Sequence, residues 1–107
     1  FNTLGNWSTP EVWRLRRTPY TLNINLSPAR KIEASGGAWM AFPDPFDSEF
    51  GAVIERSFDT WSEALDDPWC LGFFLANELA WGGQTGLAQA ALRSPPDQSA
   101  KQALLAS

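Results

Sequence analysis

The sequence contains no histidine and a single cysteine, Cys70. Without histidine the chain lacks the base of a Ser-His-Asp triad and of a Cys-His dyad, and it offers no imidazole to a metal ion. One cysteine allows neither an internal disulfide nor a zinc site built from a cysteine cluster. These absences exclude several of the commonest catalytic and metal-binding arrangements.

Positive charge and long apolar runs are also scarce. Eight Lys and Arg stand against 12 Asp and Glu, which gives a formal net charge of -4. A nucleic-acid surface needs clustered Lys and Arg to neutralise phosphates, so nucleic acid is not an expected partner. The longest apolar run, Trp69–Ala76, is far below the roughly 18–20 residues that span a membrane, so no membrane partner is expected either.

The chain does contain enough apolar material for a core, because 44% of its 107 residues are hydrophobic, among them 6 Trp and 7 Phe. This length suits one domain at most, since domains cluster at roughly 100–150 residues. The sequence begins at Phe1 without an initiator methionine or a signal peptide. We therefore expect it to be a piece of a longer protein.

Apolar spacing and breaker residues predict alternating strands and helices. The expected strands are Phe1–Trp7, Tyr20–Leu26 and Trp69–Ala76, and the expected helices begin at Pro10, run from Asp47 to Leu65 and from Leu87 to Leu92, and begin again at Gln98. The Pro- and Gly-rich segment 27–45 is too long for a simple connector. Because Trp39 and Phe42 within it need something to pack on, we expect it to be an ordered loop.

The faces of the second and third strands differ. Leu22, Ile24 and Leu26 share one face at period two, whereas the opposite face of that strand is polar and uncharged. The segment Trp69–Ala76 is apolar on both faces. This pattern predicts a strand of a parallel sheet that is buried on both sides.

The alternation of strands and helices predicts right-handed βαβ crossovers, a parallel sheet and hence an α/β fold. Three strands do not complete a closed (β/α)8 barrel, which needs roughly 250 residues. The chain is therefore predicted to be a segment of a TIM barrel, with residues 1–107 forming part of one catalytic domain.

Glu78 is the leading candidate for a catalytic residue. It follows the apolar strand at the end where parallel α/β folds build their sites. Burial beside that strand and Trp81 would favour the protonated form that a general acid needs. The alternative is a Glu that has only reached solvent at the strand end, or that pairs with an Arg.

Substrate-binding candidates accompany Glu78. Asn77 can donate and accept hydrogen bonds at once, which suits a sugar hydroxyl, and Trp81 and Trp39 each offer an indole ring on which an apolar sugar face could stack. The structural alternatives are an Asn tolerated at a turn and Trp residues that pack in a core or a loop. Each of these residues alone is a weak signal.

Asn6 and Trp7 end the first strand much as Asn77 and Glu78 end the last. The carboxyl ends of parallel strands meet at one edge of a sheet. We therefore expect both pairs to point to the same rim, and we count Asn6 and Trp7 among the substrate-binding candidates.

Three segments resemble one enzyme family. Trp69–Gly82, in which Asn77-Glu78 follows an apolar strand and Trp81-Gly82 comes after it, resembles the fourth-strand region of retaining glycoside hydrolases of the large Asn-Glu barrel superfamily, most closely the β-agarase and β-galactosidase-like members. Phe1–Ser8 resembles their second strand, and Phe42–Asp47 resembles the start of their third helix. The resemblance covers most of residues 1–92 and implies about strands 2–4 of the barrel with their helices.

The resemblance implies a retaining two-carboxylate mechanism on a β-linked galactan or agarose-like polysaccharide. Glu78 would be the general acid/base, and Asn77 would contact the sugar hydroxyl next to the anomeric carbon. The nucleophile would come from a seventh strand outside this chain. No metal or organic cofactor is implied, and the expected partners are the carbohydrate substrate and the remainder of the barrel.

The other carboxylates fit structural positions better than the nucleophile. Asp44, Asp47, Asp66 and Asp67 match helix caps or turns. With one catalytic carboxylate present, the isolated chain is expected to be inactive.

Two other interpretations stay open. A non-catalytic carbohydrate-binding protein on the same barrel scaffold would keep Trp39, Asn77 and Trp81 but lack a nucleophile. In a small α/β interaction domain, the Trp residues would form core and interface and Glu78 would be incidental. The last interpretation predicts cooperative unfolding of these 107 residues alone, whereas a barrel segment would unfold with little cooperativity.

Overall fold

The structure, a computed structural model, describes residues 2–36 and 40–107. Their contacts divide the chain into two compact units. The sheet unit comprises the described residues up to Asn25 and Ile54–Asn77, and the loop unit comprises Leu26–Val53 and Glu78–Ser107. Within the described ranges, no helix has the length and apolar character needed to cross a membrane.

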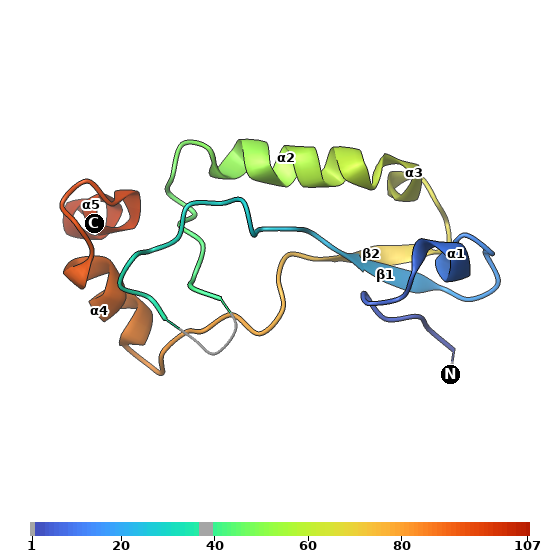
Figure 1. Ribbon diagram of the computed structural model, residues 1–107, viewed down its shortest axis with the longest axis horizontal. Helices are drawn as coiled ribbons and strands as arrows, with labels where there is room; N and C mark the ends of the chain where they lie inside the picture. The colour runs from blue at the N-terminus through green and yellow to red at the C-terminus, as the bar shows by residue number, and fades with distance from the viewer. Residues whose placement is uncertain (1, 37–39) are drawn as a thin grey trace. The chain divides into compact units, whose positions relative to one another are not determined.

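Two parallel strands, β1 (Tyr20–Asn23) and β2 (Cys70–Phe74), form the centre of the sheet unit (Figure 1). Tyr20 pairs with Cys70, and a bulge follows this pair before the register continues. The predicted alternation along β1 is present, because Tyr20 and Leu22 are buried while Thr21 and Asn23 are half-buried. The strand is shorter than the predicted Tyr20–Leu26.

Leu4 lies on the other edge of β1, where it forms a parallel bridge with Tyr20. Its N–H donates to the Pro19 carbonyl at 2.8 Å, and its carbonyl accepts from the Thr21 N–H at 3.1 Å. The three predicted strand segments are thus parallel and adjacent in chain order. The first of them makes one bridge rather than a full strand.

The core of the sheet unit forms around Trp13, which α1 (Pro10–Trp13) carries at its last position. Its indole ring stacks on Tyr20 at a centroid distance of 4.8 Å and meets Trp61 edge to face at 6.3 Å. Trp13, Tyr20 and Leu22 are each at most 2% exposed. Pro10 begins the helix as predicted, since its missing N–H costs nothing there.

The helix predicted from Asp47 to Leu65 is two helices, α2 (Phe50–Thr60) and α3 (Ser62–Leu65). They are separated at Trp61, whose backbone leaves the helical region at φ −109° and ψ 24°. The Trp61 indole N–H donates to the Asn23 carbonyl at the end of β1, at 3.1 Å. This tertiary contact accompanies the break, and no local sequence signal indicates it.

The predicted burial of the third strand on both faces is wrong for the described residues. Cys70 and Phe73 pack against the core cluster, but Leu71, Phe74 and Leu75 are 62%, 52% and 57% exposed. Within the described part of the chain, β2 pairs with β1 alone. Apolar periodicity indicates which faces a strand can bury, and it does not show which elements are present to cover them.

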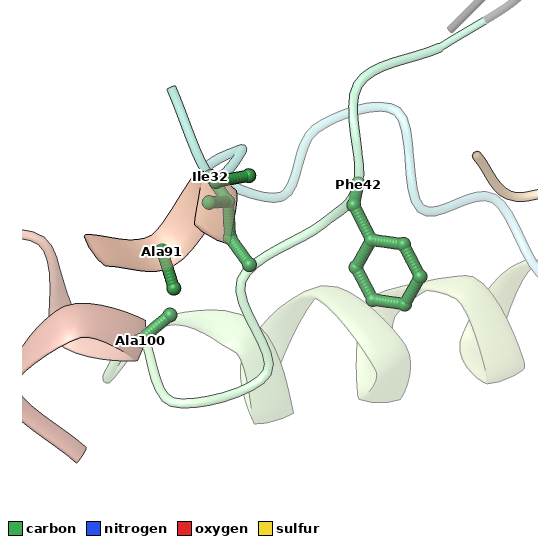
Figure 2. Packing of buried hydrophobic residues seen from close by; sticks show 5 residues of the cluster. Ile32, Phe42, Ala91 and Ala100 are labelled. Carbon is green, nitrogen blue, oxygen red and sulfur yellow. The ribbon is translucent and has the colours of Figure 1, made fainter. Parts of the chain in front are cut away.

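The loop unit packs two short helices, α4 (Gly86–Arg93) and α5 (Ser99–Ala106), against the segment 27–45. Its buried core residues are Ile32, Phe42, Ala90, Ala91 and Ala100, several of which are drawn in Figure 2. The small alanine side chains let the backbones approach closely at this core. The helix predicted around Leu87–Leu92 and the helix predicted after Gln98 are both confirmed.

The segment 27–45 is irregular but ordered in its described residues, as predicted. It doubles back on itself through an antiparallel bridge between Lys31 and Pro43. The Ile32 N–H donates to the Phe42 carbonyl at 2.9 Å, and the Asp44 N–H donates to the Arg30 carbonyl at 2.8 Å. These bonds fix the position of Phe42 beneath the helices.

Candidate functional site

Asn77 and Glu78 follow β2 in the chain, but the strand ends at Phe74, earlier than the predicted Ala76. Both side chains are exposed. The burial expected around Glu78 is therefore absent among the described residues. Its side chain faces solvent.

The backbone of Glu78 adopts a left-handed conformation, with φ +49°. Arg16 is the other described non-glycine residue with a positive φ, also +49°. Arg16 follows α1, and its N–H donates to the Trp13 carbonyl at 3.1 Å, so it is part of an ordinary helix ending. Glu78 follows a strand instead, and non-glycine residues held in this region concentrate at functional sites.

Asn6 and Trp7 lie in a turn that a hydrogen bond from the Ser8 N–H to the Gly5 carbonyl closes at 3.0 Å. Trp7 is 72% exposed and Asn6 is half-buried. Because the segments of the sheet unit are parallel, Asn6 and Asn77 both follow carboxyl ends. The first segment ends nearer the amino end of β1, however, because Leu4 pairs with Tyr20 and only Gly5 lies between Leu4 and Asn6.

Trp81 belongs to the loop unit. It is 60% exposed, and its ring meets Phe42 edge to face at a centroid distance of 4.8 Å and an interplanar angle of 69°. The predicted partner platform, Trp39, lies outside the described residues. The structure thus places Asn6, Trp7 and Asn77 in the sheet unit, and Glu78 and Trp81 in the loop unit.

The aspartates assigned to caps and turns occupy such positions. One carboxylate oxygen of each of three of them accepts the backbone N–H two residues ahead: Asp44 from Phe46 at 2.9 Å, Asp47 from Glu49 at 3.0 Å and Asp67 from Trp69 at 3.0 Å. Asp66 is the residue that ends α3. These contacts confirm the predicted cap and turn positions of the four aspartates.

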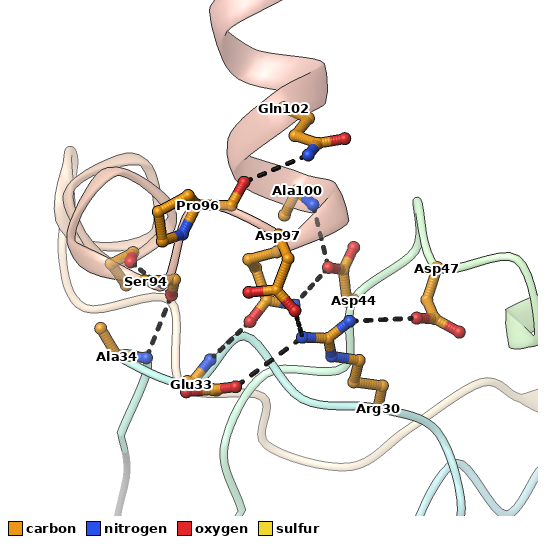
Figure 3. Close-up of polar contacts among 12 residues, drawn as sticks. Arg30, Glu33, Ala34, Asp44, Asp47, Ser94, Pro96, Asp97, Ala100 and Gln102 are labelled. Carbon is orange, nitrogen blue, oxygen red and sulfur yellow. Dashed lines mark hydrogen bonds and ion pairs between the residues drawn. The ribbon is translucent and has the colours of Figure 1, made fainter.

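Asp44 has a larger structural role than its turn position indicates. The side chain is fully buried, and its second oxygen accepts from the Gln98 amide at 2.6 Å and from the Ala100 N–H at 2.9 Å (Figure 3). Asp44 therefore caps the N-terminus of α5 from a distant part of the chain. Its place between Pro43 and Pro45 is the only sequence signal, and it does not reveal the partner.

Arg30 organises the polar surface of the same unit. Its guanidinium group lies 3.3 Å from Asp97, 3.7 Å from Glu33 and 3.9 Å from Asp47 (Figure 3). The Ser94 hydroxyl accepts from the Ala34 N–H at 3.2 Å. Together with Asp44, these contacts hold the segment 27–45 against the α4–α5 pair, so this acidic cluster is structural.

A second buried polar group lies in the sheet unit. The Tyr20 hydroxyl donates to Asp67 at 3.0 Å, and the Arg16 guanidinium group lies 3.2 Å from the same oxygen. The hydrogen bond from the Trp69 N–H, aided by Tyr20 and Arg16, lowers the pKa of Asp67. Burial, together with the neighbouring carboxylate, raises the pKa of Tyr20 well above its usual range. Both groups support the fold.

A search of the described residues finds no cluster of three or more His, Cys, Asp or Glu side chains able to hold a metal ion. At the end of β2 the described candidate side chains are the exposed carboxylate of Glu78, the neighbouring amide of Asn77 and, three positions further along the chain from Glu78, the exposed indole of Trp81.

The sequence is similar to two curated enzymes that cleave glycosides. Its similarity supports a relationship with glycoside hydrolases. It is 32% identical to β-agarase B of Vibrio sp. (strain JT0107) over 85 residues, which are 77% of this chain and 9% of the agarase. It is 31% identical to β-agarase A of the same strain over 94 residues, which are 79% of this chain and 9% of that enzyme.

The chain thus spans about 9% of the length of the curated relatives it matches. No protein-family model matches the sequence, and no solved structure matches it. The similarity to glycoside hydrolases therefore covers one region of each relative, about 9% of its length.

Proposed function

We propose that this chain is part of the catalytic barrel of a retaining glycoside hydrolase that acts on β-galactosidic, agarose-like polysaccharide. The similarity to two β-agarases supports the reaction class. The parallel pairing of β1 and β2 supports an α/β barrel segment, since closed barrels are built from such units. The exposed residues of β2 supply apolar surface for neighbouring elements to cover.

In this proposal Glu78 is the general acid/base. The observation that carries the assignment is its exposed, left-handed position after a parallel strand. Its carboxyl group would protonate the leaving glycosidic oxygen and later remove a proton from the attacking water. Asn77 would donate a hydrogen bond to the sugar hydroxyl next to the anomeric carbon.

The nucleophile would be a second carboxylate, about 5–5.5 Å from that of Glu78 in the assembled site, and supplied from outside these 107 residues. In the proposed site, closure of the barrel would also bury Glu78 and favour its protonated form. Asn6, Trp7 and Trp39 would belong to the substrate-binding rim.

The direct test is hydrolysis of agarose by a protein that carries this sequence within the complete proposed barrel. Glu78→Gln keeps the size of the side chain and removes the proton donor, and it should reduce turnover at least about 100-fold. Asp66→Asn is the matched control, because it makes a similar change at an exposed carboxylate that ends α3. Equal turnover in Glu78→Gln and in the unmodified protein would refute the assignment.

A non-catalytic carbohydrate-binding protein on the same scaffold is the second candidate. The observation that favours it is that no nucleophile is assigned beside Glu78 among the described residues, since Asp44 and Asp67 are engaged in buried hydrogen bonds. This candidate predicts binding of the polysaccharide with no turnover in the complete protein. Product analysis by chromatography separates the two.

A further inference from the structure

A small cavity of about 170 Å³ opens beside Trp81 in the loop unit. Ser35, Gly36, Gly82 and Gly86 line it together with Trp81, and its other described lining residues are alanines and one leucine. No charged side chain is among these described lining residues. The described lining of the cavity therefore includes Trp81, both polar and apolar groups, and no formal charge.

Phe42 packs against the ring of Trp81, one of the residues that line this cavity. Phe42 is 8% exposed, and its ring meets Trp81 edge to face at 4.8 Å. The Phe42 N–H donates to the Ser35 hydroxyl at 2.8 Å, and its carbonyl accepts from the Ile32 N–H at 2.9 Å. A residue fixed on both sides of its backbone offers a rigid support, so Trp81 is held although most of its surface is open.

The backbone around Trp81 is fixed by two glycines. Gly82 has φ +68°, and a Cβ there would lie 3.0 Å from the Gly86 Cα. A Cβ on Gly86 would lie 3.0 Å from the Trp81 carbonyl oxygen. The loop therefore folds closely against the start of α4, a path that larger residues would obstruct.

We propose that Trp81 and this cavity form a subsite for one neutral pyranose ring, and that Phe42 is the positioning residue that presents the indole. A ring with an apolar face and polar edge fits an exposed indole beside a partly polar wall. The volume is below the roughly 300–1,000 Å³ of pockets for drug-sized ligands, which suits one ring. The uncharged lining favours a neutral sugar over a sulfated one.

This inference rests on the proposed function for the place of the subsite in a reaction. Two residues lie between Glu78 and Trp81, so their Cα atoms lie within about 11 Å of each other. That span places the subsite close to the bond that Glu78 would protonate. The binding itself requires neither turnover nor the second carboxylate.

The test is a titration of the full chain with neutral agarose oligosaccharides, followed through the ¹⁵N-labelled indole N–H signals. Trp81→Leu assigns its own signal by removing it. We expect the Trp81 signal to shift on titration, and a sulfated galactan oligosaccharide of the same length to bind at least about tenfold more weakly, a ratio that corresponds to about 1.4 kcal/mol. Equal affinity for both sugars, or no shift of the Trp81 signal, would overturn the proposal.

Variants separate the platform from its support. Trp81→Leu should weaken neutral-sugar binding at least about tenfold, and Phe42→Leu should weaken it several-fold while the signal remains. Phe46→Leu is the matched control: it makes the same change in the same unit at a ring that is 62% exposed, and this variant should bind as the unmodified chain does. If circular dichroism shows that Phe42→Leu is unfolded, the binding measurement on Trp81→Leu is the deciding one, because Trp81 is exposed. Unchanged binding in Trp81→Leu would refute the subsite.

Failure of the subsite and failure of the proposed function are distinguishable. Sugar binding that depends on Trp81 without turnover in the complete protein would preserve the subsite and refute the hydrolase. If the complete protein turns over agarose, Trp81→Leu does not change that turnover, and the Trp81 signal never shifts, the hydrolase is preserved and the subsite is refuted.

Discussion

The Tyr20 hydroxyl donates a hydrogen bond to the buried carboxylate of Asp67 at 3.0 Å and so links β1 to the turn that precedes β2. Asp67 also accepts from the Trp69 N–H and lies beside Arg16. The first residue of β1 and the turn before β2 are thereby fixed together. Because the two strands are parallel, their carboxyl ends are aligned by a contact at their amino ends.

Tyr20→Phe should destabilise the sheet unit by about 1–2 kcal/mol, because it leaves a buried charged acceptor without one of its donors. The ring and its stacking on Trp13 remain in this variant. The measurement is urea unfolding at pH 7, monitored by tryptophan fluorescence. An unchanged unfolding midpoint would contradict the role of this hydrogen bond.

The Tyr20–Asp67 pair predicts that the stability of the fold falls at both acid and alkaline pH. The folded-state pKa of Asp67 is lowered, so its stabilisation is present above the usual carboxyl pKa, about 3.9, and is lost as pH falls further. The folded-state pKa of Tyr20 is raised, so its stabilisation is full below about pH 10 and is lost as pH rises above that value. Tyr20→Phe should remove most of the alkaline loss, which unfolding at pH 9 and pH 11 would show.

Asp44 should be the most sensitive polar residue of the loop unit. Asp44→Ala leaves the Gln98 amide and the Ala100 and Phe46 N–H groups without their acceptor, and we expect a loss of about 3 kcal/mol or more. Asp47→Ala is the comparison, because it removes a more exposed cap and should cost about 1 kcal/mol. Faster hydrogen exchange at the Ala100 amide in Asp44→Ala would show that the loss of stability lies at the start of α5. Equal losses of stability in Asp44→Ala and Asp47→Ala would contradict the special role of Asp44.

The left-handed backbone of Glu78 predicts a conflict between stability and function. Glu78→Gly removes the Cβ that makes φ +49° unfavourable, so we expect a gain of up to about 1 kcal/mol in the free energy of unfolding. Glu78→Ala keeps the Cβ and should give no such gain. Chemical denaturation of the three proteins measures this, and a loss of stability in Glu78→Gly would show that the conformation carries no strain.

The exposed face of β2 tests the proposed barrel. Leu71→Ser should change the stability of the 107-residue chain by less than about 0.5 kcal/mol, because the side chain is 62% exposed. In a protein that carries the complete proposed barrel, the same change should cost about 2–5 kcal/mol, since neighbouring elements would bury Leu71. Paired unfolding measurements on the two proteins provide the comparison. An equally small effect in both would favour a self-contained domain.

Local signals predicted the elements that local chemistry determines. Leu22, Ile24 and Leu26 indicated one face of β1 through their period-two spacing, and Ile24 and Leu26 remain buried beyond the strand end. Asp47 was expected to cap a helix, and it accepts the Glu49 N–H just before α2. Each of these features depends on residues close together in the sequence.

Features that depend on distant partners were not predictable. Trp61 ends α2 in a place where its indole N–H reaches the Asn23 carbonyl, and Asp44 is buried because Gln98 and Ala100 donate to it. The exposure of Leu71 depends on which elements cover β2. For the candidate site, the sequence supplied the order of the residues along the chain, and the support of Trp81 by Phe42 became visible only in three dimensions.

The most direct test of the account is the dependence of catalysis on the leaving group, measured with Glu78→Gly in a protein that carries the complete proposed barrel. If Glu78 is the general acid/base, agarose hydrolysis should fall by about 10²–10⁴, while a dinitrophenyl β-galactoside, whose leaving group needs no protonation, should lose much less in its first step. Added azide should then restore turnover of the activated substrate by replacing the water that Glu78 would have deprotonated. An equal loss on both substrates, with no response to azide, would contradict the assignment of Glu78.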